Sequence, residues 1–186
     1  DLHKAIRRQR QMCIRDRGMQ GKVQNDGKHL YATLKHFAAY GVPESGHNGS
    51  RANCGMRQLL SEYLPPFRKA VKEGAGTLMT SYNAIDGVPC TANKELLTDV
   101  LRNQWGFKGF VYSDLISIEG IVGMRAAKDN KEAAVKALKA GLDMDLGGNA
   151  FGKNLKKAYE EGLITMADLD RAVGNVCLLY TSDAAD

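Results

Sequence analysis

The stretch that decides the fold is Gly106-Phe107-Lys108-Gly109-Phe110-Val111-Tyr112-Ser113-Asp114-Leu115. It is a short apolar run that begins after a glycine and ends on the carboxylate of Asp114. Two earlier segments have a similar form: residues 32–38 contain Lys35-His36, and residues 77–83 end on Tyr82-Asn83. Polar side chains that follow successive strands, with helices between the strands, are typical of catalytic sites at the carboxyl ends of a parallel sheet. We therefore predict that Asp114 is a nucleophile.

The body of the chain alternates between strand-like and helix-like segments with short connections, which favours βα units and a parallel sheet. The predicted strands cover residues 31–38, 77–81, 110–113 and 142–146. The predicted helices cover residues 56–72, 93–104, 131–140, 153–161 and 166–176. Four βα units predict an α/β fold that is half of a TIM-type (β/α)8 barrel, because a complete barrel needs roughly 250 residues.

Three signals fix the ends of the predicted helices. The pair Pro65-Pro66 interrupts the helical stretch 56–72, and Gly141 ends the helix 131–140. Thr165 is the predicted N-cap of the last helix, since a threonine hydroxyl can accept a hydrogen bond from a free backbone N–H of the first turn. Asp99 and Arg102 are expected to form an i, i+3 pair on their helix.

Composition excludes several functional classes. The chain of 186 residues is 44% hydrophobic and 25% charged, as expected for a globular protein. It has no apolar run of about 18 residues, so we expect no transmembrane helix and no membrane partner. The N-terminus lacks the apolar region of a signal peptide. The four cysteines form no C-x-x-C pair, so a zinc ribbon or redox motif is not supported, and Cys54 and Cys90 are expected to be free thiols.

The two ends of the chain differ from its body. Residues 1–17 contain six basic and two acidic residues, and therefore hold +4 of the total net charge of +5. A nucleic-acid-binding protein would instead have a basic face on its folded body, so no nucleic-acid partner is expected. Residues 1–17 and 177–186 lack an amphipathic period and resemble translated sequencing-adapter strings. We expect both to be non-native; the alternative is a natural arm and tail.

Five motifs together resemble glycoside hydrolase family 3. They are Lys35 to Gly41 (KHFAAYG), residues 63–67 (YLPPF), residues 79–83 (MTSYN), residues 86–90 (DGVPC) and the Gly106–Leu115 block, in family order across residues 18–176. The resemblance is nearest to bacterial β-glucosidases in which a barrel is followed by an α/β-sandwich domain. It implies that residues 18–176 are the C-terminal half of the family's N-terminal barrel domain.

The same resemblance implies an activity and a set of site residues. The activity is hydrolysis of terminal non-reducing β-D-glycosidic bonds with retention, Asp114 being the nucleophile and the substrate a β-linked glucoside or oligosaccharide. Lys35, His36 and Tyr82 would bind sugar hydroxyls, with Met79 packing nearby. No cofactor and no metal are implied. In the family, the acid/base residue usually comes from the following domain. A second carboxylate and an arginine for the sugar come from the early barrel strands. We therefore expect this fragment to be inactive alone.

Lys35 and His36 present a geometric conflict. Adjacent residues of a regular strand point to opposite faces, so these two side chains cannot both reach one ligand. We therefore predict a local distortion, either a bulge or a cis peptide. The family is compatible with a periplasmic or secreted protein, but the sequence assigns no compartment.

Alternatives remain for the function and for single residues. The protein could be a β-xylosidase or another exo-β-glycosidase of the family, or a non-catalytic carbohydrate-binding fragment. Leu115 stands where many family members have tryptophan, which implies a less aromatic leaving-group side. Asp114 could cap a helix, His36 could be a core histidine and Tyr82 could only pack. Asp143 and Asp145 are interpreted as structural residues of the barrel rim, and Trp105 as a packing residue.

Overall fold

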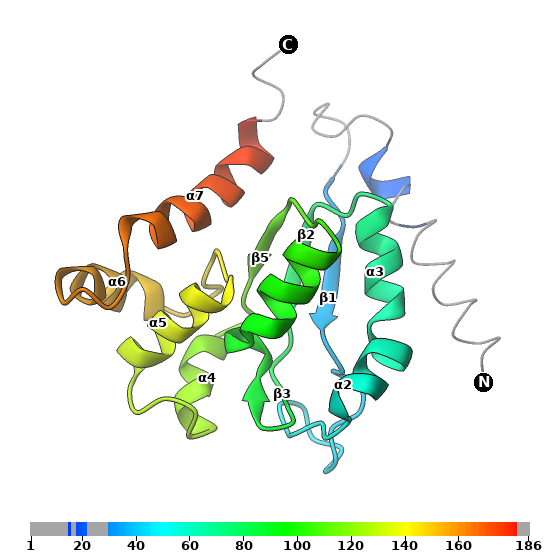
Figure 1. Cartoon of the computed structure of the whole chain (residues 1–186), viewed down its shortest axis with the longest axis horizontal. Helices are drawn as coiled ribbons and strands as arrows, with labels where there is room; N and C mark the ends of the chain where they lie inside the picture. The colour runs from blue at the N-terminus through cyan, green and yellow to red at the C-terminus, as the bar shows by residue number, and fades with distance from the viewer. Residues whose placement is uncertain (1–14, 16–17, 22–29, 182–186) are drawn as a thin grey trace.

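The computed structural model describes residues 15, 18–21 and 30–181, and within them strands and helices alternate along the chain (Figure 1). The strands are β1 (Thr33–Phe37), β2 (Thr77–Thr80), β3 (Ala84–Ile85), β4 (Val88–Pro89) and β5 (Phe110–Tyr112). The first helices are α2 (Gly55–Gln58), the π-helix η1 (Leu59–Tyr63), α3 (Pro65–Lys72), the 3-10 helix η2 (Cys90–Ala92) and the π-helix η3 (Glu95–Gln104). The later helices are α4 (Ser117–Gly123), α5 (Asn130–Ala140), α6 (Ala150–Glu160) and α7 (Met166–Thr181).

The main sheet is parallel and has the strand order β1-β2-β5. Thr77 is the register partner of Thr33 on one side and of Phe110 on the other. Helical segments lie between β1 and β2 and between β2 and β5, which is the βα alternation that the sequence predicts. The first three predicted strands are confirmed, each slightly shorter than predicted. β3 and β4 form a separate antiparallel pair that sequence analysis did not predict.

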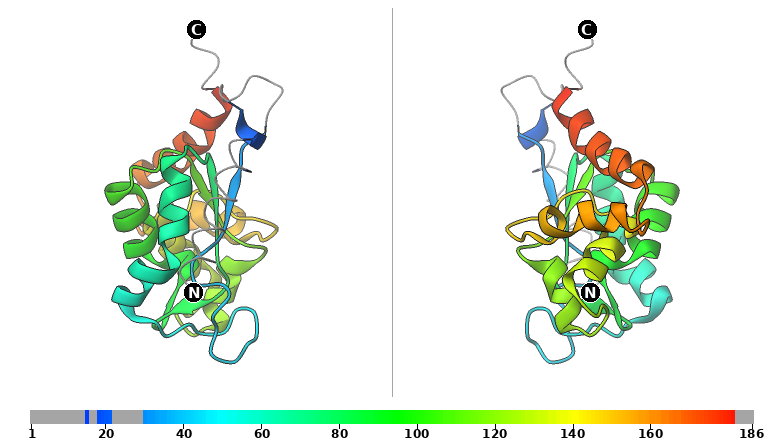
Figure 2. Two further views of the ribbon diagram at one scale, coloured as in Figure 1. Left: turned by 90° about the vertical axis from the view of Figure 1, so that its right-hand side faces the viewer. Right: turned by 90° about the vertical axis from the view of Figure 1, so that its left-hand side faces the viewer.

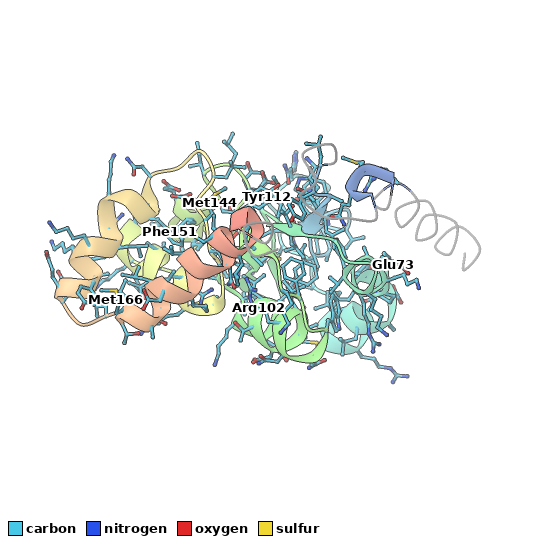
Figure 3. All side chains as sticks on the ribbon, turned by 90° about the horizontal axis from the view of Figure 1, so that it is seen from above. Glu73, Arg102, Tyr112, Met144, Phe151 and Met166 are labelled. Atoms are coloured by element: carbon cyan, nitrogen blue, oxygen red, sulfur yellow. The ribbon has the colours of Figure 1, made fainter. Side chains whose placement is uncertain are left out.

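The predicted fourth strand, residues 142–146, is wrong. This segment runs beside β5 and is joined to it by backbone hydrogen bonds such as that from the Ser113 N–H to the Met144 carbonyl, but the strand pairing is limited to one isolated bridge, between Tyr112 and Met144. Figure 3 shows these two side chains next to each other. The reason is a competing acceptor, because the Val111 N–H donates to the Asp143 carboxylate at 2.8 Å. A side chain thus takes a backbone donor that a regular ladder would have paired with a carbonyl.

The two faces of the sheet differ in burial. Leu34, Leu78 and Val111 are fully buried on one face, which α3 and η3 cover (Figure 2). On the other face Thr33, Phe110 and Tyr112 are only half-buried. Helices on a sheet face bury strand side chains that would otherwise contact water. The described residues therefore form a mixed α/β unit with one well-covered sheet face.

The predicted helix ends are largely confirmed. Pro65 is the first residue of α3, a position at which proline's missing N–H costs no hydrogen bond. Gly141 follows α5 with φ of 110°, a left-handed conformation that glycine adopts readily. Thr165 accepts a hydrogen bond from the Asp168 N–H, and the Asp168 carboxylate accepts one from the Thr165 N–H. This reciprocal pair confirms Thr165 as the N-cap of α7.

A buried carboxylate at Asp143 ties three elements together. Its side chain is fully buried and forms ion pairs with Arg102 of η3 at 2.5 Å and Arg171 of α7 at 2.6 Å. Asn175 of α7 donates to the same carboxylate at 2.9 Å. The expected pair between Asp99 and Arg102 is therefore wrong: Arg102 turns away from its own helix surface, toward a charge 41 residues further along the chain. Asp143 is structural, as the sequence interpretation held.

The aromatic packing beneath the sheet includes Trp105. Its ring lies edge-on to Phe37, with 6.0 Å between the ring centroids, and Phe37 packs in the same way against Phe67 at 5.1 Å. Edge-to-face pairs of this kind stabilise a core beyond their buried area. Trp105 therefore packs against the core, as its place before Gly106 indicated. Cys54 and Cys90 are free thiols, also as expected.

Gly109 should not tolerate a side chain. A Cβ atom at this position would overlap the carbonyl oxygen of Gly76 and lie 2.8 Å from the Phe107 ring. Since the first obstacle is backbone, Gly109→Ala is expected to lower the free energy of unfolding by about 1–3 kcal/mol in urea titrations. Gly120→Ala is the matched control, because a Cβ there meets nothing within 4 Å. An equal loss of stability in both variants would contradict the close packing at Gly109.

Loss of the Asp143 ion pairs should strongly destabilise the fold. Asp143→Asn would leave Arg102 and Arg171 without their buried counter-charge, so we expect a loss of about 3–5 kcal/mol in the free energy of unfolding. Asp99→Asn, which removes a carboxylate from the solvent side of η3, is expected to change stability by less than about 0.5 kcal/mol. Chemical denaturation of both variants measures the difference. A small effect of Asp143→Asn would show that the two arginines find other acceptors.

Candidate active site

The carboxyl ends of β1, β2 and β5 bring three of the predicted site residues together. His36 lies in β1, while Tyr82 follows β2 and Asp114 follows β5. The His36 Nε2 atom lies 3.5 Å from the Asp114 Oδ2 atom. The Tyr82 hydroxyl donates a hydrogen bond of 2.8 Å to the carbonyl of Leu115, the residue after Asp114. Equivalent ends of parallel strands share one edge of the sheet, which is why residues so far apart in sequence meet here.

The predicted distortion at Lys35-His36 is present. The peptide bond between these residues is cis, as is that between Phe37 and Ala38. The β1–β2 register also shifts between Leu34 and Phe37. Neighbouring backbone and side chains hold the segment, since the Ser81 N–H donates to the Phe37 carbonyl at 2.9 Å and the Asn83 amide donates to the Ala38 carbonyl at 3.3 Å. Strict strand alternation therefore does not apply at this point.

Lys35 and Met79 occupy environments that differ from those of His36, Tyr82 and Asp114. Lys35 is exposed, and no hydrogen bond or ion pair from the described residues engages its ammonium group. Met79 is 9% exposed and lies in β2, in register with Tyr112 of β5. Met79 can therefore form part of a wall, while the Lys35 ammonium is free to meet a ligand.

The Asp114 carboxylate is buried and oriented by its neighbours. Its side chain is only 12% exposed. Oδ1 accepts a hydrogen bond of 2.7 Å from the Leu115 N–H, which orients the carboxylate. Oδ2 is the oxygen that faces His36. A buried carboxylate with a fixed orientation has the arrangement that attack on an electrophilic carbon requires.

Electrostatics keep Tyr82 protonated. Burial raises the pKa of the Tyr82 phenol, and the nearby Asp114 carboxylate raises it further because two negative charges would repel each other. At neutral pH the phenol is therefore a hydrogen-bond donor. It donates to the backbone of the Asp114–Leu115 loop and couples β2 to the nucleophile candidate.

His36 is held in its neutral form. Burial lowers the pKa of the imidazole, and this effect exceeds the opposing influence of the Asp114 carboxylate, which favours the charged form. The neighbouring Lys35 ammonium lowers the pKa further. A neutral imidazole can donate from one nitrogen and accept at the other, which suits the recognition of a hydroxyl group.

Sequence analysis missed Tyr40 as a site residue. Its ring lies against the His36 imidazole with 4.2 Å between the ring centroids and 30° between the ring planes. The only sequence signal was its place within the Lys35–Gly41 motif. A position four residues after His36 has no fixed direction once the strand has ended, so the contact was not predictable from spacing.

The segment 145–149 braces the loop that carries Asp114. The Ile116 N–H donates to the Leu146 carbonyl at 3.0 Å, and the Leu146 N–H donates to the Ser113 hydroxyl at 2.9 Å. Asp145 accepts from the Ala150 and Phe151 N–H groups at the start of α6. Asp145 thus acts as a helix cap, which agrees with its interpretation as structural.

Within the part of the chain that the structure describes, no group of three or more His, Cys, Asp or Glu side chains is arranged to hold a metal ion. Among the described helices, none combines the length and hydrophobicity needed to cross a bilayer.

Ile116 lies in an unfavourable backbone conformation beside Asp114. Its φ of 58° and ψ of 19° are left-handed, a region that a β-branched residue rarely adopts. Ile116→Gly is expected to raise the free energy of unfolding by about 1 kcal/mol, because glycine adopts this conformation without steric cost. Leu115→Gly is the matched control, because Leu115 is 52% exposed and Ile116 is 51% exposed, but Leu115 has no positive φ. The Leu115→Gly variant should therefore lose stability. Urea titration of both variants measures the free energy of unfolding. A loss of stability in Ile116→Gly would contradict the proposed backbone strain at Ile116.

Comparisons with known proteins place this arrangement in a family context. A periplasmic beta-glucosidase of Salmonella typhimurium is 37% identical over 160 residues, which are 86% of this chain and 21% of that protein. A beta-xylosidase of Formosa agariphila is 43% identical over 140 residues, 74% of this chain and 19% of that protein. The crystal structure of a beta-glucosidase from Listeria innocua superposes with a TM-score of 0.88 at 34% identity, covering 91% of this chain and 24% of that one. This chain thus spans about a fifth of its curated relatives.

A family model also matches most of the chain. Residues 11–179 match the glycosyl hydrolase family 3 N terminal domain. That range contains all three parallel strands and every candidate site residue described above. The chain therefore belongs to glycosyl hydrolase family 3, as a mixed α/β fragment of the family's N-terminal (β/α)8 domain.

Proposed function

We propose that this chain carries the nucleophile of a retaining exo-β-glycosidase, and that the nucleophile is Asp114. The observation that supports the proposal is the buried Asp114 carboxylate at the carboxyl end of the sheet, oriented by the Leu115 N–H and with its Oδ2 atom 3.5 Å from the imidazole of His36. The whole protein would hydrolyse terminal non-reducing β-D-glycosidic bonds. Relatives named as beta-glucosidase and beta-xylosidase support this class of reaction.

The reaction would proceed in two displacements. Asp114 Oδ2 attacks the anomeric carbon, the bond from that carbon to the glycosidic oxygen breaks, and the departing oxygen takes a proton from a second carboxylic acid. Water then attacks the same carbon, gives its proton to the second carboxylate and releases Asp114. Two inversions retain the configuration. In the family that acid usually comes from a following domain, and we assign no residue of this chain to the role.

The remaining site residues would position the sugar. Lys35 offers an ammonium group and His36 a neutral imidazole, and both can hydrogen-bond to ring hydroxyls. The Tyr82 phenol would contribute a further donor or acceptor, and Met79 an apolar wall beneath the ring. Orientation of a bound substrate against a nucleophile supplies a large part of the rate acceleration in enzymes.

A β-glucoside is the first candidate substrate and a β-xyloside the second. The glucoside is supported by the similarity to structures of the Listeria innocua enzyme, one of which contains glucose. The xyloside is supported by the 43% identity to the Formosa agariphila relative. Leu115 is exposed beside Asp114. With no aromatic ring at this position, we expect leaving groups to be held by apolar contact more than by stacking.

The domain assignment is also a proposal. Residues 18–176 would form the C-terminal half of the barrel domain, and residues 1–17 and 177–186 would be non-native. The half-buried sheet face of Thr33, Phe110 and Tyr112 supports a barrel interior that the other half covers. The isolated chain would then lack both its acid/base and its barrel partner, so we expect no turnover from it. The similarity to a periplasmic relative supports a periplasmic or secreted parent protein.

Trapping the covalent intermediate tests the nucleophile. In the full-length parent protein, a 2-deoxy-2-fluoro-β-glucoside with an activated aglycone should inactivate the enzyme. The fluorine slows the displacements, but the activated leaving group keeps the first one fast enough for the covalent intermediate to accumulate. Peptide mapping is expected to find the sugar on Asp114, and Asp114→Asn should bind no label. Asp145→Asn, which alters the neighbouring carboxylate that caps α6, should leave the label on Asp114.

The same experiment separates the alternatives. Faster inactivation by the 2-fluoro-β-xyloside would favour the β-xylosidase assignment over the β-glucosidase. Label on a peptide without Asp114 would refute the nucleophile. Retention of the glycoside by equilibrium binding, with neither label nor turnover, would indicate a non-catalytic carbohydrate-binding protein.

A further inference from the structure

Tyr40 is an aromatic residue at the site that the proposed mechanism does not use. It lies three residues beyond the end of β1, after the left-handed residue Ala39. Its ring stands 4.2 Å from the imidazole of His36, measured between centroids, with the planes inclined by 30°. The side chain remains 39% exposed, so one side of the ring covers His36 while the rest of it contacts solvent.

His36 therefore has two neighbours of different character. The Asp114 carboxylate lies 3.5 Å from its Nε2 atom, and the Tyr40 ring lies against its plane. Tyr40 is also near enough to Tyr82 to add, after burial and Asp114, to the causes that raise the Tyr82 pKa. Tyr40, His36, Asp114 and Tyr82 thus form one contiguous group drawn from the ends of three strands.

We propose that Tyr40 is a positioning residue of this site: its ring shields one face of the His36 imidazole from water and fixes that imidazole beside the Asp114 carboxylate. Its relevance to catalysis rests on the proposed function. The contact itself does not, since it can be measured in the chain as it stands. Tyr40 needs no contact with substrate or with the reacting atoms for this role.

The charges around His36 explain why shielding matters. Asp114 and Lys35 act on it in opposite directions, the carboxylate favouring the imidazolium and the ammonium disfavouring it. Tyr82 remains an uncharged phenol at neutral pH, because its pKa is raised. Burial is the largest influence and keeps the pKa of His36 below its ordinary value. A ring that excludes water from the imidazole contributes directly to that burial.

A neutral His36 has a consequence for Asp114. An imidazolium at this distance would compensate the carboxylate charge and compete with the positive charge that develops at the anomeric carbon. A neutral imidazole leaves the Asp114 charge available to stabilise that transition state. Tyr40 would therefore act on the nucleophile through His36, by keeping the imidazole both oriented and uncharged.

The first test follows the titration of His36 by NMR in the isotopically labelled chain. His36→Gln assigns the resonance among the four histidines of the sequence. Tyr40→Phe retains the ring and should leave the pKa of His36 lowered, as burial lowers it in the unaltered chain. Tyr40→Leu removes the ring and should move the His36 pKa upward, toward the ordinary value of an exposed histidine. Tyr159→Leu is the matched control, because Tyr159 is 43% exposed on α6 and should leave His36 unchanged.

The outcomes of this titration are distinct. An unchanged His36 pKa in Tyr40→Leu, or an equal shift in Tyr159→Leu, would overturn the proposal. Circular dichroism checks that each variant folds. Should Tyr40→Leu fail to fold, Tyr40→Trp retains a stacking ring and should keep the His36 pKa low, and Tyr40→Gln should raise it. Equal values in those two variants would likewise overturn the role of the ring.

The second test measures kinetics in the full-length parent protein. Tyr40→Leu is expected to lower kcat/KM roughly 10- to 100-fold, as for other misplacements of catalytic groups, and to move the acid limb of its pH profile to higher pH. Tyr40→Phe should keep both kcat/KM and the acid limb of the pH profile close to those of the unaltered protein. A loss of activity without movement of the acid limb would show a merely structural role. If the parent protein has no glycosidase activity, the proposed function fails while the NMR titration still decides the role of Tyr40.

Discussion

The structure depends on one buried carboxylate. The Asp143 carboxylate forms ion pairs with Arg102 at 2.5 Å and with Arg171 at 2.6 Å, and it also accepts a hydrogen bond from the Val111 N–H. Charges removed from water are stable only when paired and hydrogen-bonded, and the Asp143 carboxylate satisfies that condition with partners from β5, η3 and α7. Arg102 extends the connection to the Gly109 carbonyl at 3.1 Å. The strand that leads to Asp114 is thereby held at both its entry and its middle.

The candidate site inherits its rigidity from this arrangement. Ser113 and Asp114 follow directly after β5, and the segment after Asp143 returns to brace them through Leu146. On the other side, the β1 segment at His36 is held by backbone and side-chain donors from the residues that follow β2. A nucleophile must be held within a fraction of an ångström of its productive position, so catalytic carboxylates are usually supported from several elements. The position of Asp114 fits that requirement.

Much of the fold was predictable because its signals are local. The strands at residues 77–81 and 110–113 are short apolar runs bounded by glycine or polar residues, and the end of α5 at Gly141 and the cap of α7 at Thr165 depend on single side chains. The distortion at Lys35-His36 was predictable for another reason: two neighbouring ligands conflict with strand alternation. The fourth strand failed because its apolar pattern carries no information about Asp143 taking a ladder donor from Val111.

The sequence by itself determined the order of the βα units, the family motifs and the identity of the carboxylate that ends β5. Those properties reside in residues adjacent in the chain or at fixed spacing along it. Only the tertiary structure decided that Arg102 pairs with Asp143, that Tyr40 covers His36 and that His36 faces Asp114 at 3.5 Å. These contacts join residues whose side-chain directions depend on how β1, β5 and the helices pack, and hydrophobic periodicity does not encode those directions.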